Sequence, residues 1–288
     1  QRSPTQNLKA PMKNRMILAA IAALPCLLRA DEVADAGRKL AETKAASILQ
    51  IEGVVEISIE GKLAGMAGGN QEQKSEALGT VIDKSGLILV SDGILNPAKM
   101  MKPMSVNVGG EQQTITVSGQ LKEVRIKLPD GTEFPGRVLL TVDDLDLPFV
   151  VPEKALTPEQ SAKLVPLELG AGTAKPALLD YILSVTRLSR EMNSEVSIRP
   201  GRVLATLTKP RTAWLGANDV GAPVYNLGGD LLGFTLVRRD GATSTSEVRP
   251  GAMQMGARAE PVLVPLSDIL PVVEQAREEA AKKAKKDE

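Results

Sequence analysis

Residues Trp214–Phe234 read WLGANDVGAPVYNLGGDLLGF, and this stretch decides the fold. It opens with a polar, glycine-rich turn at 216–221 and continues into a short apolar strand at Val224 and Tyr225. A second turn, Asn226–Asp230, leads into another strand that begins at Leu231. Two strands joined by glycine-rich turns within so few residues predict tightly folded antiparallel β structure.

The same stretch resembles the nucleophile region of trypsin-like serine proteases of the HtrA/Deg type, which reads roughly GNSGGPLLNLDGEVIGI. Residues 218–223, NDVGAP, align with GNSGGP, and residues 226–234 follow without a gap. The alignment puts Val220 at the position of the nucleophilic serine. It also puts Asn218, Asp219 and Val220 where the family forms its oxyanion hole, with Asn218 in the place of a glycine.

Two further blocks extend the resemblance. Residues 79–95 read GTVIDKSGLILVSDGIL, which is similar to the family's GFVIDxxGYILTNNHVV and places Gly93 at the catalytic histidine. Residues 143–150 read DDLDLPFV and match the family's DxxxDLAVL, with Asp146 at the triad aspartate. Among the three triad positions, Asp146 alone keeps the family's residue type.

The resemblance covers most of residues 51–275 and implies an all-β, trypsin-like fold of two antiparallel barrels. We expect these barrels at residues 51–152 and 153–265, with a short N-terminal helix at 31–50. Residues 266–288 are expected to form a C-terminal helix with a charged tail, and no PDZ-like sequence follows it.

Hydrophobic period and turn residues predict the individual elements. The methionines at 100, 101 and 104 are expected to fill gaps in a core. The expected elements are a first strand at 54–59, a polar loop at 62–76, a hairpin at 79–90, a Met-rich and then Gly-rich segment at 96–120, a hairpin at 124–142, a linker at 151–164, a polar loop at 187–198 and a helix at 266–286.

The amino-acid composition limits both the kind of core and the catalytic groups that the chain can have. Apolar residues make up 43% of the chain, but only three Phe, two Tyr and one Trp are present, so the core must be aliphatic. The 288 residues include no histidine, which removes both the usual general base and the commonest metal ligand. We therefore expect no metal and no cofactor.

The N-terminal residues indicate export. Residues 1–11 precede the first methionine and are set aside as upstream sequence. Residues 12–30 read as a signal peptide, with a basic start at Met12–Arg15, an apolar run at Met16–Leu24 and a cleavage point after Ala30. An uncleaved anchor or a buried helix is the alternative. Cys26 lies inside this segment, but its neighbours do not fit a lipoprotein motif.

The mature chain from Asp31 would contain no cysteine and would be exported to a bacterial periplasm or secreted. The first 30 residues contain five basic and no acidic side chains, whereas the whole chain has 35 of each sign. The mature protein would therefore have a net charge of −5, and we expect no nucleic-acid partner.

Serine-protease chemistry requires a nucleophile, a base and a group that orients the base. Val220 has no nucleophilic atom and Gly93 has no side chain, so we expect the chain to be catalytically inactive. Three other arrangements stay open. They are an acid–base pair of Asp92 and Asp146, a loose calcium site at Asp143, Asp144 and Asp146, and a serine–lysine pair that no motif marks.

The main hypothesis is an exported pseudoprotease of HtrA/Deg type that acts by binding. Its partner would be a protein or a peptide, and an active protease relative fits that description. No stable membrane span is expected after removal of the signal peptide, and an oligomer stays open. The alternative hypotheses are a hydrolase with relocated catalytic groups and a structural module of an envelope assembly.

Overall fold

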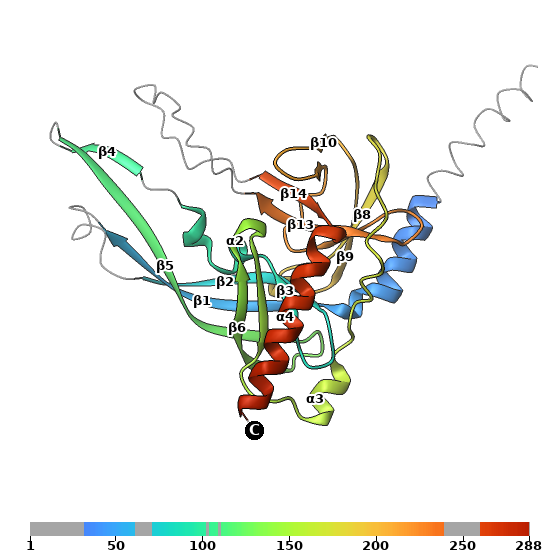
Figure 1. Ribbon diagram of the computed structural model, residues 1–288, viewed down its shortest axis with the longest axis horizontal. Helices are drawn as coiled ribbons and strands as arrows, with labels where there is room; N and C mark the ends of the chain where they lie inside the picture. The colour runs from blue at the N-terminus through green and yellow to red at the C-terminus, as the bar shows by residue number, and fades with distance from the viewer. Residues whose placement is uncertain (1–31, 61–70, 102–103, 109–110, 239–259, 288) are drawn as a thin grey trace, which may run out of the picture.

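The computed structural model describes residues 32–60, 71–101, 104–108, 111–238 and 260–287 (Figure 1). Within these residues the chain forms two seven-stranded antiparallel sheets. Six strands of the first sheet close into a barrel, and the second sheet forms a half-barrel. With a short N-terminal helix and a C-terminal helix, the described chain has the all-β double-barrel architecture that the sequence predicts.

The first sheet has the order β1-β2-β3-β7-β6-β5-β4, and pairing of β1 with β5 closes its barrel. Its strands are β1 (Ile48–Glu60), β2 (Gln71–Val81), β3 (Ile88–Val90), β4 (Met104–Val108), β5 (Glu111–Lys127), β6 (Glu133–Val142) and β7 (Leu147–Pro152).

The second sheet has the order β10-β11-β14-β13-β12-β8-β9. Because β9 and β10 lie at opposite ends of this order, the sheet stays open along one side. Its strands are β8 (Tyr181–Arg187), β9 (Val196–Arg202), β10 (Ala205–Leu207), β11 (Ala213–Leu215), β12 (Pro223–Tyr225), β13 (Leu231–Arg238) and β14 (Glu260–Pro265).

Helices flank the sheets. The N-terminal helix covers residues 32–44 and ends earlier than predicted, because the 3-10 turn η1 (Ala45–Ser47) leads directly into β1. Residues 48–50 are therefore strand and not helix. The remaining helical segments are α2 (Asp92–Leu95), η2 (Pro97–Met100), η3 (Asp143–Leu145), α3 (Pro158–Lys163), η4 (Arg190–Met192) and α4 (Leu266–Asp287).

Helix α4 follows β14 without a loop and was predicted at this place. Its residues Leu266, Ile269, Val273 and Ala276 are buried, and their spacing places them on one face of the helix. That face joins a core cluster to which both sheets contribute, for example Phe149 of β7. The two barrels and α4 therefore share one large core, and each barrel has a smaller cluster of its own.

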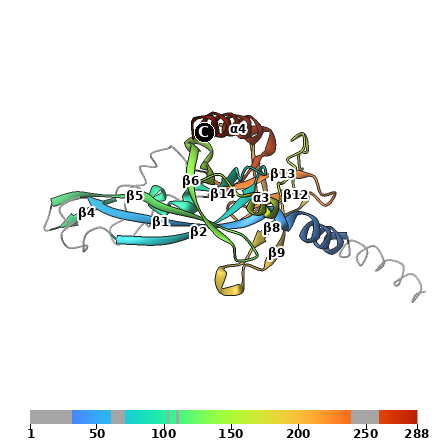
Figure 2. The same ribbon diagram turned by 90° about the horizontal axis from the view of Figure 1, so that it is seen from below.

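The longest strands project from the first barrel as an arm, which we define as residues 54–60, 71–76, 104–108 and 111–123 of β1, β2, β4 and β5 (Figures 1 and 2). The predicted loop at 62–76 is therefore wrong for residues 71–76, and the Met-rich and Gly-rich segment at 96–120 contains β4 and much of β5. The expectation that its methionines fill a core is wrong for Met101, which is exposed. Gly119 is needed where the arm meets the barrel, because a Cβ there would lie 2.4 Å from the Cβ of Ala98 in η2.

No described helix has the length and apolar character needed to cross a membrane. The predictions for residues 1–11, for the signal peptide at 12–30 and for Cys26 fall outside the described residues. The predicted linker at 151–164 contains the end of β7 and helix α3, whose Thr157 and Gln160 form a capping box. The polar loop predicted at 187–198 is shorter, because β8 ends at Arg187 and β9 begins at Val196.

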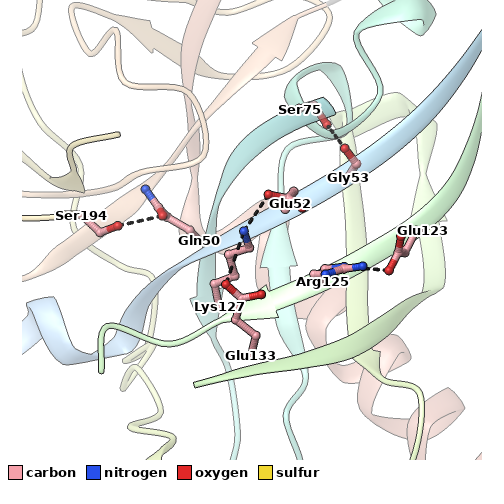
Figure 3. A network of polar contacts seen from close by, with 9 residues as sticks. All are labelled: Gln50, Glu52, Gly53, Ser75, Glu123, Arg125, Lys127, Glu133 and Ser194. Carbon is pink, nitrogen blue, oxygen red and sulfur yellow. Dashed lines mark hydrogen bonds and ion pairs between the residues drawn. The ribbon is translucent and has the colours of Figure 1, made fainter. Parts of the chain in front are cut away.

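A charged network crosses β1 and β5 where the barrel begins (Figure 3). Lys127 Nζ donates to Glu52 Oε2 over 2.6 Å, and the two residues are only 8% and 7% exposed. Glu133 Oε1 lies 3.5 Å from the same ammonium group. The hydrogen bond from Lys127 holds the pKa of the Glu52 carboxyl below its usual value, although burial acts in the opposite direction. The charged form of Glu52 therefore stabilises the fold.

This lowered pKa predicts a pH-dependent stability difference. The contribution of Glu52 is complete above its unfolded pKa of about 4.3 and is lost as the pH falls through the lower folded pKa. We expect Glu52→Gln to reduce the free energy of unfolding by about 3 kcal/mol at pH 7, because it leaves a buried ammonium group poorly compensated. The difference from the unmodified protein should shrink between pH 5 and pH 3, as measured by urea unfolding.

The exposed pair Glu123–Arg125 on the same sheet supplies the control. Exposed ion pairs contribute little, so Glu123→Gln should change the free energy of unfolding by less than about 1 kcal/mol at any pH in this range. Equal effects of the two substitutions would contradict a stabilising role for the buried pair.

Candidate functional site

The carboxylate of Asp146 is the centre of the candidate site. Asp146 is 1% exposed and follows η3 in the left-handed region, at φ 55° and ψ 39°, which Asp adopts more readily than most residues. Its Oδ2 accepts from Ser91 Oγ over 2.7 Å and its Oδ1 accepts from the backbone N–H of Gly93 over 2.9 Å. The structure thus brings the predicted positions Asp146 and Gly93 into direct contact.

The local sequence explains this contact. Strand β3 ends at Val90 and the short helix α2 begins at Asp92, so the first N–H groups of α2 lack partners within the helix. The side chain of Ser91 at the N-cap makes no capping bond, because its hydroxyl donates to Asp146 instead. The Asp146 backbone carbonyl also accepts from Asp92 N over 3.0 Å. Asp146, which lies in another part of the chain, therefore caps the N-terminus of α2 by accepting from its first two N–H groups.

Asp92 has a different partner. Its Oδ2 lies 2.7 Å from Nζ of Lys99 in η2, and the Asp92 side chain is nearly buried. Because the carboxylates of Asp92 and Asp146 are each engaged by other groups, the arrangement does not support a shared proton between them. No cluster of acidic side chains among the described residues is suited to a metal ion, so the calcium alternative has no support there either.

Val220 lies in a tight turn that faces the first barrel. Ala222 N donates to the carbonyl of Asp219 over 3.0 Å, and Gly221 N donates to the carbonyl of Thr235 in β13 over 2.6 Å. Gly221 has φ 87°, and a Cβ there would lie 3.3 Å from the carbonyl oxygen of Leu78 in β2. Strand β2 pairs with β3, the strand that leads to Gly93, so the turn of Val220 approaches the same end of the first barrel.

Of the two remaining positions that align with the family's oxyanion hole, Asp219 forms an ion pair. Asp219 Oδ1 lies 3.0 Å from Arg199 Nε of β9, while Asn218 is exposed. Burial raises the pKa of the Asp219 carboxyl, and the nearby Arg199 guanidinium partly opposes this shift. The pair connects the turn before β12 to strand β9, which lies on the far side of β8 in the sheet.

A cavity of about 530 Å³ lies beside η3. Its walls come from η3, the loop before β11, strands β13 and β14 and the start of α4. The lining residues are Asp143, Asp144, Leu145, Pro210, Arg211, Thr212, Ala213, Leu236, Val237, Arg238, Val262, Val264 and Asp268. Three carboxylates and two guanidinium groups therefore surround an apolar floor, and the Arg211–Asp144 pair at 3.4 Å is exposed and weak.

No described strand pairs with the β12 side of β13 at Val237, a buried residue that lines this cavity. Thr235 directs both its N–H and its carbonyl toward the β12 side, where they pair with Ala222 and Gly221. Backbone N–H and carbonyl groups of successive residues in a strand point to alternate sides, so those of Val237 point to the β12 side, as those of Thr235 do. No described strand pairs with Val237 on that side. The geometry leaves a backbone donor and acceptor next to the cavity.

Sequence reasoning missed several of these groups. Ser91 is a polar residue directly after a buried strand, a signal that was available in the sequence. The cavity residues Arg211, Thr212 and Val237 lie outside the short block that aligns around Val220, and no local pattern marks them. Arg199 could not be assigned to Asp219, because their pairing depends on the sheet order.

A scan against models of known protein families and a search of curated proteins both found no match. The resemblance to HtrA/Deg proteases therefore rests on the three sequence blocks. At the level of architecture, the chain consists of two β-barrel-like sheets that are compatible with a trypsin-like fold.

Proposed function

We propose that this protein is an HtrA/Deg-like pseudoprotease that binds extended peptide segments of other proteins and does not cleave them. The observation that supports the proposal most strongly is the set of hydrogen bonds that the Asp146 carboxylate accepts. This carboxylate, which in an active triad would orient a histidine, here accepts hydrogen bonds from Ser91 Oγ and Gly93 N. At the position that aligns with the catalytic base, Gly93 offers this carboxylate only a backbone N–H, so Asp146 has no side-chain base to orient.

The alternative, a hydrolase with relocated groups, would need an accessible nucleophile near a base. Ser91 is the hydroxyl next to Asp146, but it is 1% exposed and cannot reach a bound peptide. Val220 offers no hydroxyl or thiol, and the chain has no histidine. These features favour binding over hydrolysis.

Peptide binding is supported by the side of β13 at Val237 with which no described strand pairs. An extended peptide adds to a sheet edge through main-chain hydrogen bonds, and its alternate side chains enter pockets beside the edge. Val237 supplies the main-chain groups, and the cavity under Leu145 and Leu236 supplies an apolar floor. Because carboxylates outnumber guanidinium groups around the cavity, we expect a preference for apolar residues followed by neutral or basic ones.

We also propose that the protein is exported, because residues 12–30 have the features of a signal peptide. N-terminal sequencing of the protein from its host tests this hypothesis directly.

Filling the cavity should abolish peptide binding. Thr212 is exposed at the cavity wall, so Thr212→Trp should place an indole in the cavity without disturbing the core. We expect this variant to bind a fluorescent decapeptide rich in leucine and lysine at least about tenfold more weakly, a loss of about 1.4 kcal/mol. Fluorescence anisotropy measures the affinity.

Thr208→Trp is the matched control, because Thr208 is exposed in the same loop but does not line the cavity. It should bind like the unmodified protein, and equal losses in both variants would contradict the assigned site. The bound peptide should be recovered intact by mass spectrometry. Cleaved peptide, or stoichiometric labelling of a serine by a fluorophosphonate, would support the hydrolase alternative instead.

A further inference from the structure

The outer edge of β2 along the arm is not paired with any described strand. Strand β2 pairs with β1 from Gln71 to Thr80, but on its other side β3 pairs only with residues 79–81. Residues 71–74 are exposed, and Figure 2 shows β2 at the margin of the arm. Within the described part of the chain, no strand covers this edge. An open edge of this kind is a template for pairing with another strand.

Two charged residues on this edge, Glu72 and Lys74, are exposed. Glu72 stands directly opposite Glu56 of β1, and like charges in such a pair are unfavourable. Glu56 is itself bound by Lys122 at 2.6 Å. Neither Glu72 nor Lys74 forms an ion pair with another described residue. A cation beside Glu72 and an anion beside Lys74 would complement these exposed charges.

We propose that a second copy of this chain pairs antiparallel with the 71–75 edge of β2, about a two-fold axis at Gln73. In this register Glu72 faces the partner's Lys74, and Lys74 faces the partner's Glu72. Gln73 faces the partner's Gln73, and Gln71 faces the partner's Ser75. The same strand thus supplies both halves of a self-complementary interface, as two-fold symmetry requires.

The sequence selects this register over its neighbours. With the axis moved to Glu72, the two copies of Glu72 would face each other. With the axis at Lys74, the two copies of Lys74 would meet and Glu72 would face the partner's Glu76. With the axis at Ser75, the partner's Gln71 would fall on Gly79, whose edge is already paired with Val90. The axis at Gln73 brings opposite charges together on the exposed residues 71–74. The axis at Ser75 would also place Lys74 opposite the partner's Glu76, but that pairing would centre on Ser75 and Ala77, which are buried.

The interface is small. Five residues from each copy bury less than the ~1,200 Å² that is typical of a stable complex. We therefore expect a reversible equilibrium between monomer and dimer. This dimer uses a different surface from the cavity beside β13, so it can be tested independently of peptide binding.

Cross-linking at the axis tests the pairing. Facing residues of an antiparallel pair have Cα atoms about 4.5–5.5 Å apart, within the range that a disulfide spans. We expect Gln73→Cys, in a Cys26→Ser chain with no other cysteine, to form a disulfide-linked dimer under mild oxidation. Ser118→Cys is the matched control, because Ser118 is exposed on β5 of the same arm. Its yield should be at least about tenfold lower on a non-reducing gel, and equal yields would overturn the proposal.

A charge swap tests the register. In the Gln73→Cys background, Lys74→Glu or Glu72→Lys alone should lower the dimer yield several-fold, because each places like charges opposite one another. The double variant Glu72→Lys with Lys74→Glu should restore the yield, since the opposite charges are only exchanged. Both residues are exposed, and circular dichroism should show an unchanged fold. Single variants without effect, or a double variant that stays low, would refute this pairing.

Discussion

Asp146→Ala is expected to lower the free energy of unfolding by about 3–5 kcal/mol, the usual range for removing one partner from a buried charged contact. The substitution leaves the Ser91 hydroxyl and the Gly93 N–H buried without their acceptor. It also places alanine at φ 55°, where Asp and Asn are better tolerated. Urea unfolding at neutral pH measures the change.

Asp146→Asn provides the control, because it keeps the side-chain shape and the left-handed preference. Its amide oxygen can still accept from Gly93 N–H, but the negative charge is lost and the Ser91 hydroxyl must reverse to accept from the amide NH2, so we expect about half of the loss seen with alanine. A loss below about 1 kcal/mol for Asp146→Ala would contradict a structural role for this carboxylate.

Arg187→Met should lower the free energy of unfolding by a similar amount, about 3–4 kcal/mol, because it leaves three backbone carbonyl oxygens without their donor. The guanidinium of Arg187 donates to the backbone carbonyls of Ala45, Ile48 and Ser194. Desolvation lowers the pKa of this group, and the nearby Glu195 carboxylate partly opposes this shift. The contacts fasten the loop at 188–195 to the start of β1.

Two measurements separate this role from general destabilisation. Limited proteolysis under native conditions should cut Arg187→Met within 188–195 faster than the unmodified protein. Arg187→Lys keeps the charge but lacks the planar fork of donors, so it should recover only part of the stability. Full recovery by lysine, or unchanged proteolysis in the methionine variant, would show that the three carbonyl contacts do not hold the loop.

The sequence predicted the parts of the fold that local signals mark. The Lys84–Gly86 turn between two apolar runs, and the apolar spacing in α4, each identify their element without knowledge of the rest of the chain. The meeting of Gly93 with Asp146 followed from the resemblance. The contact itself depends on the left-handed turn after η3, which no propensity indicates.

The arm and the Arg187 contacts could not be predicted for physical reasons. Residues 71–74 are polar and exposed on both faces of β2, so they lack the alternation that identifies a half-buried strand. Arg187 binds carbonyl groups of residues more than a hundred positions away, and backbone acceptors have no sequence signature. The cavity likewise combines segments that only the sheet order brings together.

The core shared by both barrels and α4 also sets the order of events during synthesis. Ile269, Val273 and Ala276 fill the same cluster as Leu89 and Phe149 of the first barrel. A ribosome adds about 5–20 residues per second, and the cluster cannot close until α4 has left the exit tunnel. The nascent chain therefore stays without its largest core until residues 266–276 have been synthesised and have left the tunnel, although both barrels have been made by then.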